Sequence, residues 1–260
     1  MWTSKRSLML KGQDILLLFK LASLHAREVS TPLGHPTKTL GGLTELDYLR
    51  EDYASEQLLT FAPAAEEPRA DIRVLIDRFV EADSLRWRGW DAVEDSPSEE
   101  AEPKWEDRYT LRALAESLGL SKSEISNSIS RCRASGLITN DYETSFLKVN
   151  RVALLKITEH ALKYFFPAKP GALARGIPTG FASPMLSKHL KSAGENIHVW
   201  PDPNGTERGQ MIEPVYKTVP EAVKKDRTLY HYLALVDSIR MGGPREMTVA
   251  IQLLKRGMGF

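Results

Sequence analysis

The sequence is poor in the features that mark secreted or membrane-bound proteins. It has a single cysteine, Cys132, so no intrachain disulfide can form and a reducing compartment is expected. No apolar run approaches the roughly 20 residues that a membrane-spanning helix needs. The first residues also lack the pattern of a signal peptide. We therefore expect a cytoplasmic protein that does not contact a membrane.

Patterns typical of catalysis are scarce as well. The six histidines are dispersed, with no HExxH pattern and no pair at metal-ligand spacing. The chain has no Walker loop, no GxGxxG and no GxSxG. Gly205 and Gly209 lie close to two acids, Asp202 and Glu207, but polar loops commonly hold such residues by chance. We expect no enzyme activity, no metal and no cofactor.

The net charge of +1 hides a segregation of charge along the chain. Residues 44–107 carry 19 acidic and 7 basic side chains, a net charge of −12, which leaves +13 for the rest of the chain. Within residues 148–191, eight lysines and arginines accompany one acid, Glu159. Such a separation gives one surface that suits a polyanion and another that repels it.

Residues 109–138 hold the most informative pattern. After a capping residue, Thr110, apolar side chains recur at helical spacing: Leu111, Leu114, Ala115 and Leu118. Gly119 follows where the chain must turn, a position that favours a residue tolerating positive φ. Ser121 and Glu124 then form a capping box that opens a second helix. One face of this helix is apolar: Ile125, Ile129 and Cys132. The pattern predicts a helix-turn-helix; the alternative is an ordinary helical hairpin in an unrelated core.

The spacing of Ala115, Gly119 and Ile125 resembles the helix-turn-helix of bacterial winged-helix transcriptional regulators, including the MarR-like group. These three residues supply a small side chain for close helix packing, a turn residue and a buried β-branched anchor. The resemblance implies a mainly α fold with a small β wing, in which the second helix reads the major groove of DNA. The C-terminal region also resembles that of bacterial regulators of unassigned function.

The second helix carries a short, polar outer face. At 100° per residue, the positions opposite Ile125 are Ser123, Asn127, Ser130 and Ala134. Small hydroxyl and amide groups let a helix lie deep in the major groove, and an asparagine can bond adenine at two positions. A solvated face would instead carry mixed Glu and Lys, whereas this helix has four serines: Ser123, Ser126, Ser128 and Ser130.

We therefore predict ten residues that contact DNA, some through base edges and the cationic ones through phosphates. They come from the first cap, the second helix and the helix after the wing: Thr110, Ser121, Lys122, Ser123, Ser126, Asn127, Ser130, Arg131, Arg133 and Arg151. For the helix after the wing, a merely solvated basic face is an equal alternative.

The helix-turn-helix is expected to belong to a winged helix-turn-helix domain made from residues 8–27 and 108–166. Residues 8–27 are apolar over most of the helical circumference and should be buried. Residues 138–149 can form a small hairpin without a long basic wing. Asn150 is expected to cap a helix that continues to residue 166.

Residues 28–107 are interpreted as an acidic helical insertion into this domain. Residues 43–61 and 69–87 show helical spacing. Residues 91–104 are acidic, contain proline and have few apolar groups, which is typical of a mobile linker.

Residues 167–260 are expected to form a loop-rich, helical C-terminal region that dimerises or binds a partner or effector. Residues 167–220 are rich in Pro and Gly, and 199–210 is interpreted as an ordered loop built from turns. Residues 219–240 and 245–256 are predicted to form a helical hairpin.

Two functions of different classes follow. The first is a sequence-specific DNA-binding transcriptional regulator, a homodimer that reads a palindromic operator in double-stranded DNA with its two 121–134 helices. The alternative is a protein-interaction module, such as an antitoxin or a defence-system adaptor. In that case residues 28–107 or 167–260 would bind another protein, and DNA binding would be secondary or autoregulatory.

Overall fold

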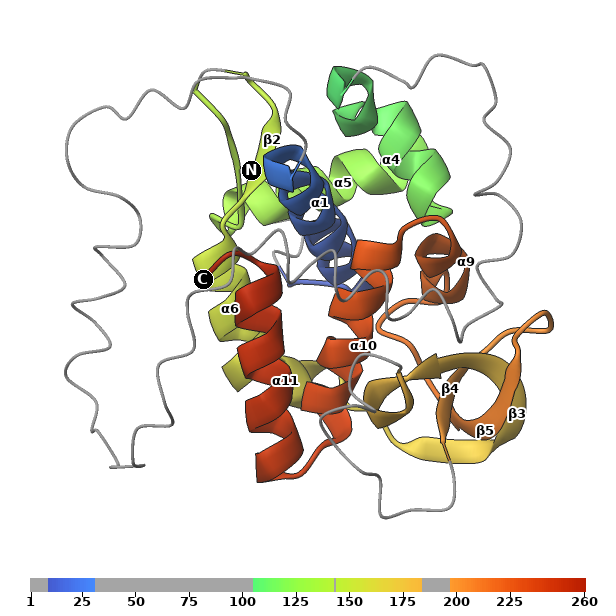
Figure 1. The fold of residues 1–260 in the computed structure, drawn as a ribbon. Helices are drawn as coiled ribbons and strands as arrows, with labels where there is room; N and C mark the ends of the chain where they lie inside the picture. Colours follow the sequence, from blue (N-terminus) through green and yellow to red (C-terminus); the bar gives the residue numbers. More distant parts are fainter. Residues whose placement is uncertain (1–8, 31–104, 143, 184–196) are drawn as a thin grey trace, which may run out of the picture.

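The computed structural model describes residues 9–30, 105–142, 144–183 and 197–260, which form a mainly helical fold with two small sheets (Figure 1). Of the insertion predicted at 28–107, the structure describes only the ends, 28–30 and 105–107; the helices predicted at 43–61 and 69–87 and the linker at 91–104 lie outside the described residues. In the parts of the chain that are described, no helix combines the length and the apolar character needed to cross a membrane.

Helix α1 (Gly12–Ser30) runs through the centre of the fold. It begins four residues later than the predicted start at residue 8. The Asp14 carboxylate caps this end of the helix, because it accepts the backbone N–H of Lys11 at 2.8 Å, a group with no partner inside the helix. Apolar side chains cover most of its circumference, and each is at most 3% exposed: Ile15, Leu16, Leu17, Leu18, Phe19, Leu21, Ala22 and Leu24.

The predicted helix-turn-helix is formed by α4 (Leu111–Leu118) and α5 (Lys122–Ala134), preceded by a 3-10 turn, η2 (Trp105–Tyr109). Both helices and strand β2 pack against α1. The predicted hairpin is present as two antiparallel strands, β1 (Ile138–Asn140) and β2 (Leu147–Val149).

The helix predicted over residues 150–166 is interrupted. It forms as α6 (Arg151–His160) and α7 (Leu162–Phe165), which are separated at Ala161, where φ is −119°. The Asn150 side chain caps α6 as expected, accepting the N–H of Ala153 at 3.0 Å.

The prediction of a loop built from turns over residues 199–210 is correct only for 202–206, where Gly205 N–H bonds the Asp202 carbonyl. The residues on either side are strands, and three strands close into a small barrel. Strand β3 (Pro170–Thr179) pairs antiparallel with both β4 (His198–Pro201) and β5 (Glu207–Ile212), and β4 pairs parallel with β5. Only glycine fits at position 176, since a Cβ there would lie 1.9 Å from the Trp200 carbonyl oxygen.

The helix predicted over residues 219–240 is divided into α9 (Val219–Lys224) and α10 (Arg227–Met241). The division lies at Asp226, whose carboxylate caps α10 by accepting the N–H of Leu229 at 3.0 Å. Helix α11 (Pro244–Gly257) packs on α10, and together they form the predicted helical hairpin.

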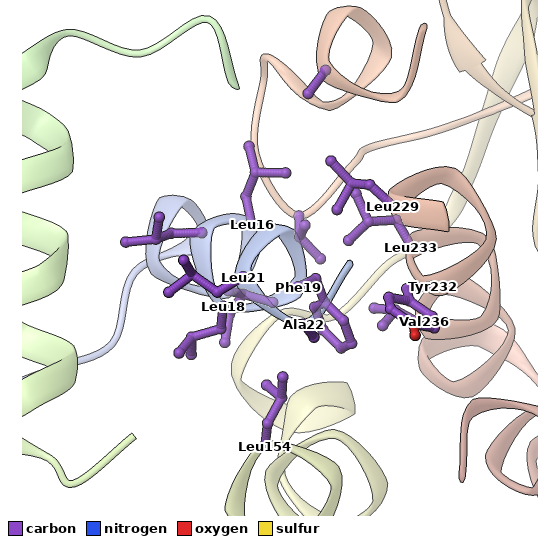
Figure 2. Packing of buried hydrophobic residues seen from close by; sticks show 14 of the residues in the cluster. Leu16, Leu18, Phe19, Leu21, Ala22, Leu154, Leu229, Tyr232, Leu233 and Val236 are labelled. Carbon is purple, nitrogen blue, oxygen red and sulfur yellow. The ribbon is translucent and has the colours of Figure 1, made fainter. Parts of the chain in front are cut away.

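A single hydrophobic core joins these elements. Side chains of α1, α6 and α10 meet at its centre, where Phe19, Leu154 and Val236 lie close together (Figure 2). The core extends to α4 and α5 on one side and to α11 on the other. The division into a domain ending at residue 166 and a region at 167–260 stays a prediction, and the core crosses that boundary.

A candidate nucleic-acid interface

The turn between α4 and α5 is built from local hydrogen bonds. Thr110 Oγ1 accepts the N–H of Ala113 at 3.2 Å and so caps α4. Gly119 ends the helix with φ +62°, in the left-handed region that favours glycine. The backbone N–H of Leu120 then returns to the carbonyl of Ala115 at 3.0 Å. These bonds fix the direction in which α5 leaves the turn.

The capping box predicted at the start of α5 is present. Glu124 Oε2 accepts the Ser121 N–H at 2.9 Å, and Ser121 Oγ accepts the Glu124 N–H at 3.2 Å. The backbone and hydroxyl hydrogen bonds from Ser121 lower the pKa of Glu124. The hydroxyl of Tyr216 also donates to Glu124, at 3.3 Å. The first turn of α5 is thereby stabilised both by the preceding residue Ser121 and by Tyr216 from the C-terminal region.

The outer face of α5 is exposed and polar. Its exposed side chains include six of the predicted contact residues: Lys122, Ser123, Ser126, Asn127, Ser130 and Arg133. Asn127 forms no hydrogen bond with the described residues, so its amide is available to a ligand. Ser130 Oγ donates to the carbonyl of Ser126 at 2.9 Å and keeps its lone pairs for accepting.

Ser128 departs from the four-serine surface predicted for this helix. Its side chain is fully buried and its Oγ accepts from Gln13 at 3.4 Å and from Arg131 at 3.1 Å. The helical period explains the difference, because residue 128 lies three positions after Ile125 and so shares the face that packs on α1.

Arg131 is held by a buried carboxylate. Its Nε and Nη2 donate to the two oxygens of Asp14 at 2.9 and 2.6 Å, and the Asp14 side chain is 0% exposed. This hydrogen-bonded pair raises the pKa of Arg131. The guanidinium therefore joins α5 to α1. A phosphate contact by Arg131 stays a prediction, and it would have to use the donors that Asp14 leaves free.

The β1–β2 hairpin is attached to α5 through a residue that sequence analysis missed. Arg133 Nη2 donates to Asn140 Oδ1 at 2.7 Å across the turn. Phe146 stacks on Tyr109 with ring centroids 5.0 Å apart, and Tyr142 near the hairpin tip is fully exposed. The sequence predicts only a hairpin over residues 138–149, and no local pattern indicates that Asn140 contacts the second helix.

The remaining predicted contact residues lie in different surroundings. Thr110 and Ser121 are exposed, but their side chains already cap α4 and α5. Arg151 is partly buried at the start of α6, where its Nη1 donates to the Met258 carbonyl and its guanidinium lies 5.4 Å from the ring centroid of Phe260. The structure thus brings the α5 residues together and leaves Arg151 with α11.

Cys132 lies on the buried face of α5, as the helical period predicted, and is 0% exposed. Burial raises the pKa of its thiol to about 12, so the reactive thiolate is negligible near neutral pH. In the portion of the chain that the structure describes, no three His, Cys, Asp or Glu side chains gather as a metal site would require.

Helix α9 supports the turn of the helix-turn-helix, a contact between segments about 100 residues apart that no sequence pattern indicated. Lys225 Nζ, just after α9, donates to the carbonyl of Glu116 at 2.9 Å. A Cβ placed at Gly119 would lie 3.2 Å from Glu221 Oε2, which shows how closely α9 approaches. On its other side, α9 pairs through Lys224 with Asp202 beside the small barrel.

Comparison of the chain with known protein families, with curated proteins and with solved structures gives no match. The function is therefore inferred from the geometry of α4 and α5.

Proposed function

We propose that the protein is a sequence-specific DNA-binding transcriptional regulator that reads the major groove with α5. The observation that supports this most is the division of α5 into two faces. One face is anchored on α1 by Ile125, Ser128 and the Arg131–Asp14 pair, and the other carries short polar side chains that are exposed. A rigid helix with such a face suits insertion into a groove about 12 Å wide.

Within this proposal, some side chains of α5 contact base edges and others contact phosphates, according to their chemistry. Asn127 offers a donor and an acceptor for the N6 and N7 atoms of adenine, and Ser123 and Ser126 bond base edges over short distances. Lys122 and Arg133 lie at the two ends of the helix, where they neutralise phosphates on either side of the groove. The β1–β2 hairpin beside α5 takes the place of a small wing.

The regulator is proposed to act as a homodimer on a palindromic operator. A single recognition helix contacts few base pairs, and two copies about 34 Å apart would reach successive major grooves on one face of the duplex. Light scattering of the full chain at micromolar concentration should then give twice the 29.2 kDa chain mass. A monomer both in solution and on DNA would contradict the palindromic model.

Alanine substitutions on the outer face test base reading. Asn127→Ala and Ser123→Ala should each weaken binding to the selected duplex by about 1–3 kcal/mol, because each removes hydrogen bonds to base edges. Both side chains are exposed, so the melting temperature should stay close to that of the original protein. A duplex selected from a random pool and a scrambled duplex would be compared by fluorescence anisotropy.

Lys122→Ala is the matched control on the same face. Loss of a phosphate contact should weaken binding to the selected and scrambled duplexes equally, since phosphates carry no sequence information. If Asn127→Ala behaved like Lys122→Ala, α5 would not be reading bases, and the proposal of a sequence-specific regulator would fail.

A further inference from the structure

The small barrel places two arginines directly opposite each other. In the β3–β5 register Arg175 pairs with Arg208, and both side chains are exposed. Opposed residues of an antiparallel pair project from the same face, with Cβ atoms about 5 Å apart. Like charges at that spacing repel and weaken the ladder, so the pair is unfavourable unless an anion lies against it.

No carboxylate of the described residues neutralises this arginine pair. Neither guanidinium forms a hydrogen bond or an ion pair with a described residue. The next opposed pair on the same face of the strands is Leu173 with Gln210, and neither residue is charged. Asp202 bonds the Arg175 carbonyl only through its backbone N–H, and its carboxylate is bound to Lys224 and to the N–H of Asn204. Among the described residues, nothing therefore competes with an external anion for these two charges.

The barrel lies on the same side of the molecule as the helix-turn-helix turn, with α9 between them (Figure 1). The ion pair from Asp202 to Lys224 joins the barrel to α9, and Lys225 joins α9 to α4. Eight residues separate Arg208 from Tyr216, which bonds Glu124 at the start of α5. An extended chain of that length spans at most about 29 Å, which is less than one turn of duplex DNA.

We propose that the Arg175–Arg208 pair binds phosphate groups of the DNA backbone that flank the bases read by α5. This inference rests on the proposed function and deepens it. A guanidinium group binds two phosphate oxygens through a pair of parallel N–H donors. Two guanidinium groups side by side can therefore bind the same phosphate or two neighbouring phosphates. Contacts of this kind are independent of sequence and fix the protein on the duplex.

The experiment compares two operator duplexes and two double variants of the full chain. The short duplex ends at the bases protected by α5, and the long duplex extends it by about ten base pairs, one helical turn, on each side. Arg175→Gln/Arg208→Gln removes the pair. Arg245→Gln/Arg256→Gln removes the same charge from two exposed positions of α11 and is the control.

The original protein should bind the long duplex at least about ten-fold more tightly than the short one at 0.1 M salt, because two phosphate contacts per protomer are added. The Arg175→Gln/Arg208→Gln variant should bind both duplexes equally. Its plot of log affinity against log salt on the long duplex should be shallower by about 2 per protomer. The control variant and Arg175→Lys/Arg208→Lys should keep the preference for the long duplex.

The melting temperature of the glutamine variant should equal or exceed that of the original protein, since repulsion is removed. An unchanged preference for the long duplex in that variant would overturn the inference, as would an equal loss on both duplexes. An original protein that selects an operator but ignores its flanks would overturn this inference alone. One that selects no sequence would overturn the proposed function as well.

Discussion

Replacement of Asp226 by alanine is expected to lower the free energy of unfolding by about 3–5 kcal/mol, the range for removing one partner of a buried ion pair. The carboxylate is 1% exposed and accepts hydrogen bonds from Lys20 at 2.7 Å, Ser23 at 2.8 Å and Arg27 at 2.8 Å. The Lys20 side chain is only 8% exposed, so its ammonium would remain buried without a counter-charge. The cap of α10 at Leu229 would be lost as well.

Urea unfolding followed by circular dichroism would measure this loss. Glu221→Ala is the control, because Glu221 is a 61% exposed carboxylate paired with Lys225 and should change stability by less than about 0.5 kcal/mol. A loss below about 1 kcal/mol for Asp226→Ala would show that the buried Lys20 and the partly exposed Arg27 find other partners.

The same residue should govern part of the acid unfolding. Burial alone would raise the pKa of Asp226, but the charges of Lys20 and Arg27 outweigh it and the pKa is lowered. A lowered folded-state pKa means that the contribution is fully present above the unfolded value of about 3.9 and is lost as pH falls through the folded value. The Asp226→Ala variant should therefore lose less stability between pH 5 and pH 3 than the original protein.

Arg131→Met is expected to cost a similar amount, about 3–5 kcal/mol, because it leaves the Asp14 carboxylate buried and unpaired. The double variant Arg131→Met/Asp14→Leu should recover part of this loss: no buried charge is then left unpaired, but the hydrogen bond from the Lys11 N–H to Asp14 is lost. Arg133→Met, two residues along on the exposed face, removes only the exposed hydrogen bond to Asn140 and should cost about 1 kcal/mol. Urea unfolding of the original protein, Arg131→Met, Asp14→Leu and the double variant would give the coupling energy between the two residues.

This series separates the two roles considered for Arg131. If Arg131→Met keeps its stability and loses affinity for every duplex equally, the side chain contacts phosphate and its pairing with Asp14 is incidental. A loss of stability that the double variant reverses identifies Arg131 as the residue that positions α5 on α1.

The features that the sequence predicts correctly are those with local signals. The capping box joins residues three apart, and Gly119 meets a conformational demand of its own position. The buried face of α5, including Cys132, follows from the helical period alone. Element boundaries were less accurate, as at Asp226, where one capping carboxylate divides a predicted helix in two.

The barrel escaped prediction because its strands lack the usual composition and are paired over long distances. Strand β3 contains Gly171, Gly176 and Pro178, residue types that are depleted in strands. The ion pair between Asp14 and Arg131 likewise joins positions 117 residues apart. Local periodicity indicates neither the pairing of Arg175 with Arg208 nor the ion pair of Arg131 with Asp14, so only the three-dimensional structure reveals them.

The position of α1 has a consequence for synthesis in the cell. Lys20 and Asp226 are separated by 206 residues, which at roughly 5–20 residues per second corresponds to a wait of about 10–40 s on the ribosome. During that time α10 has not been synthesised, so the apolar surface of α1 that packs against it stays exposed. Nascent chains are therefore expected to bind chaperones. Chains that stop before α10 should be degraded even though they contain a complete helix-turn-helix.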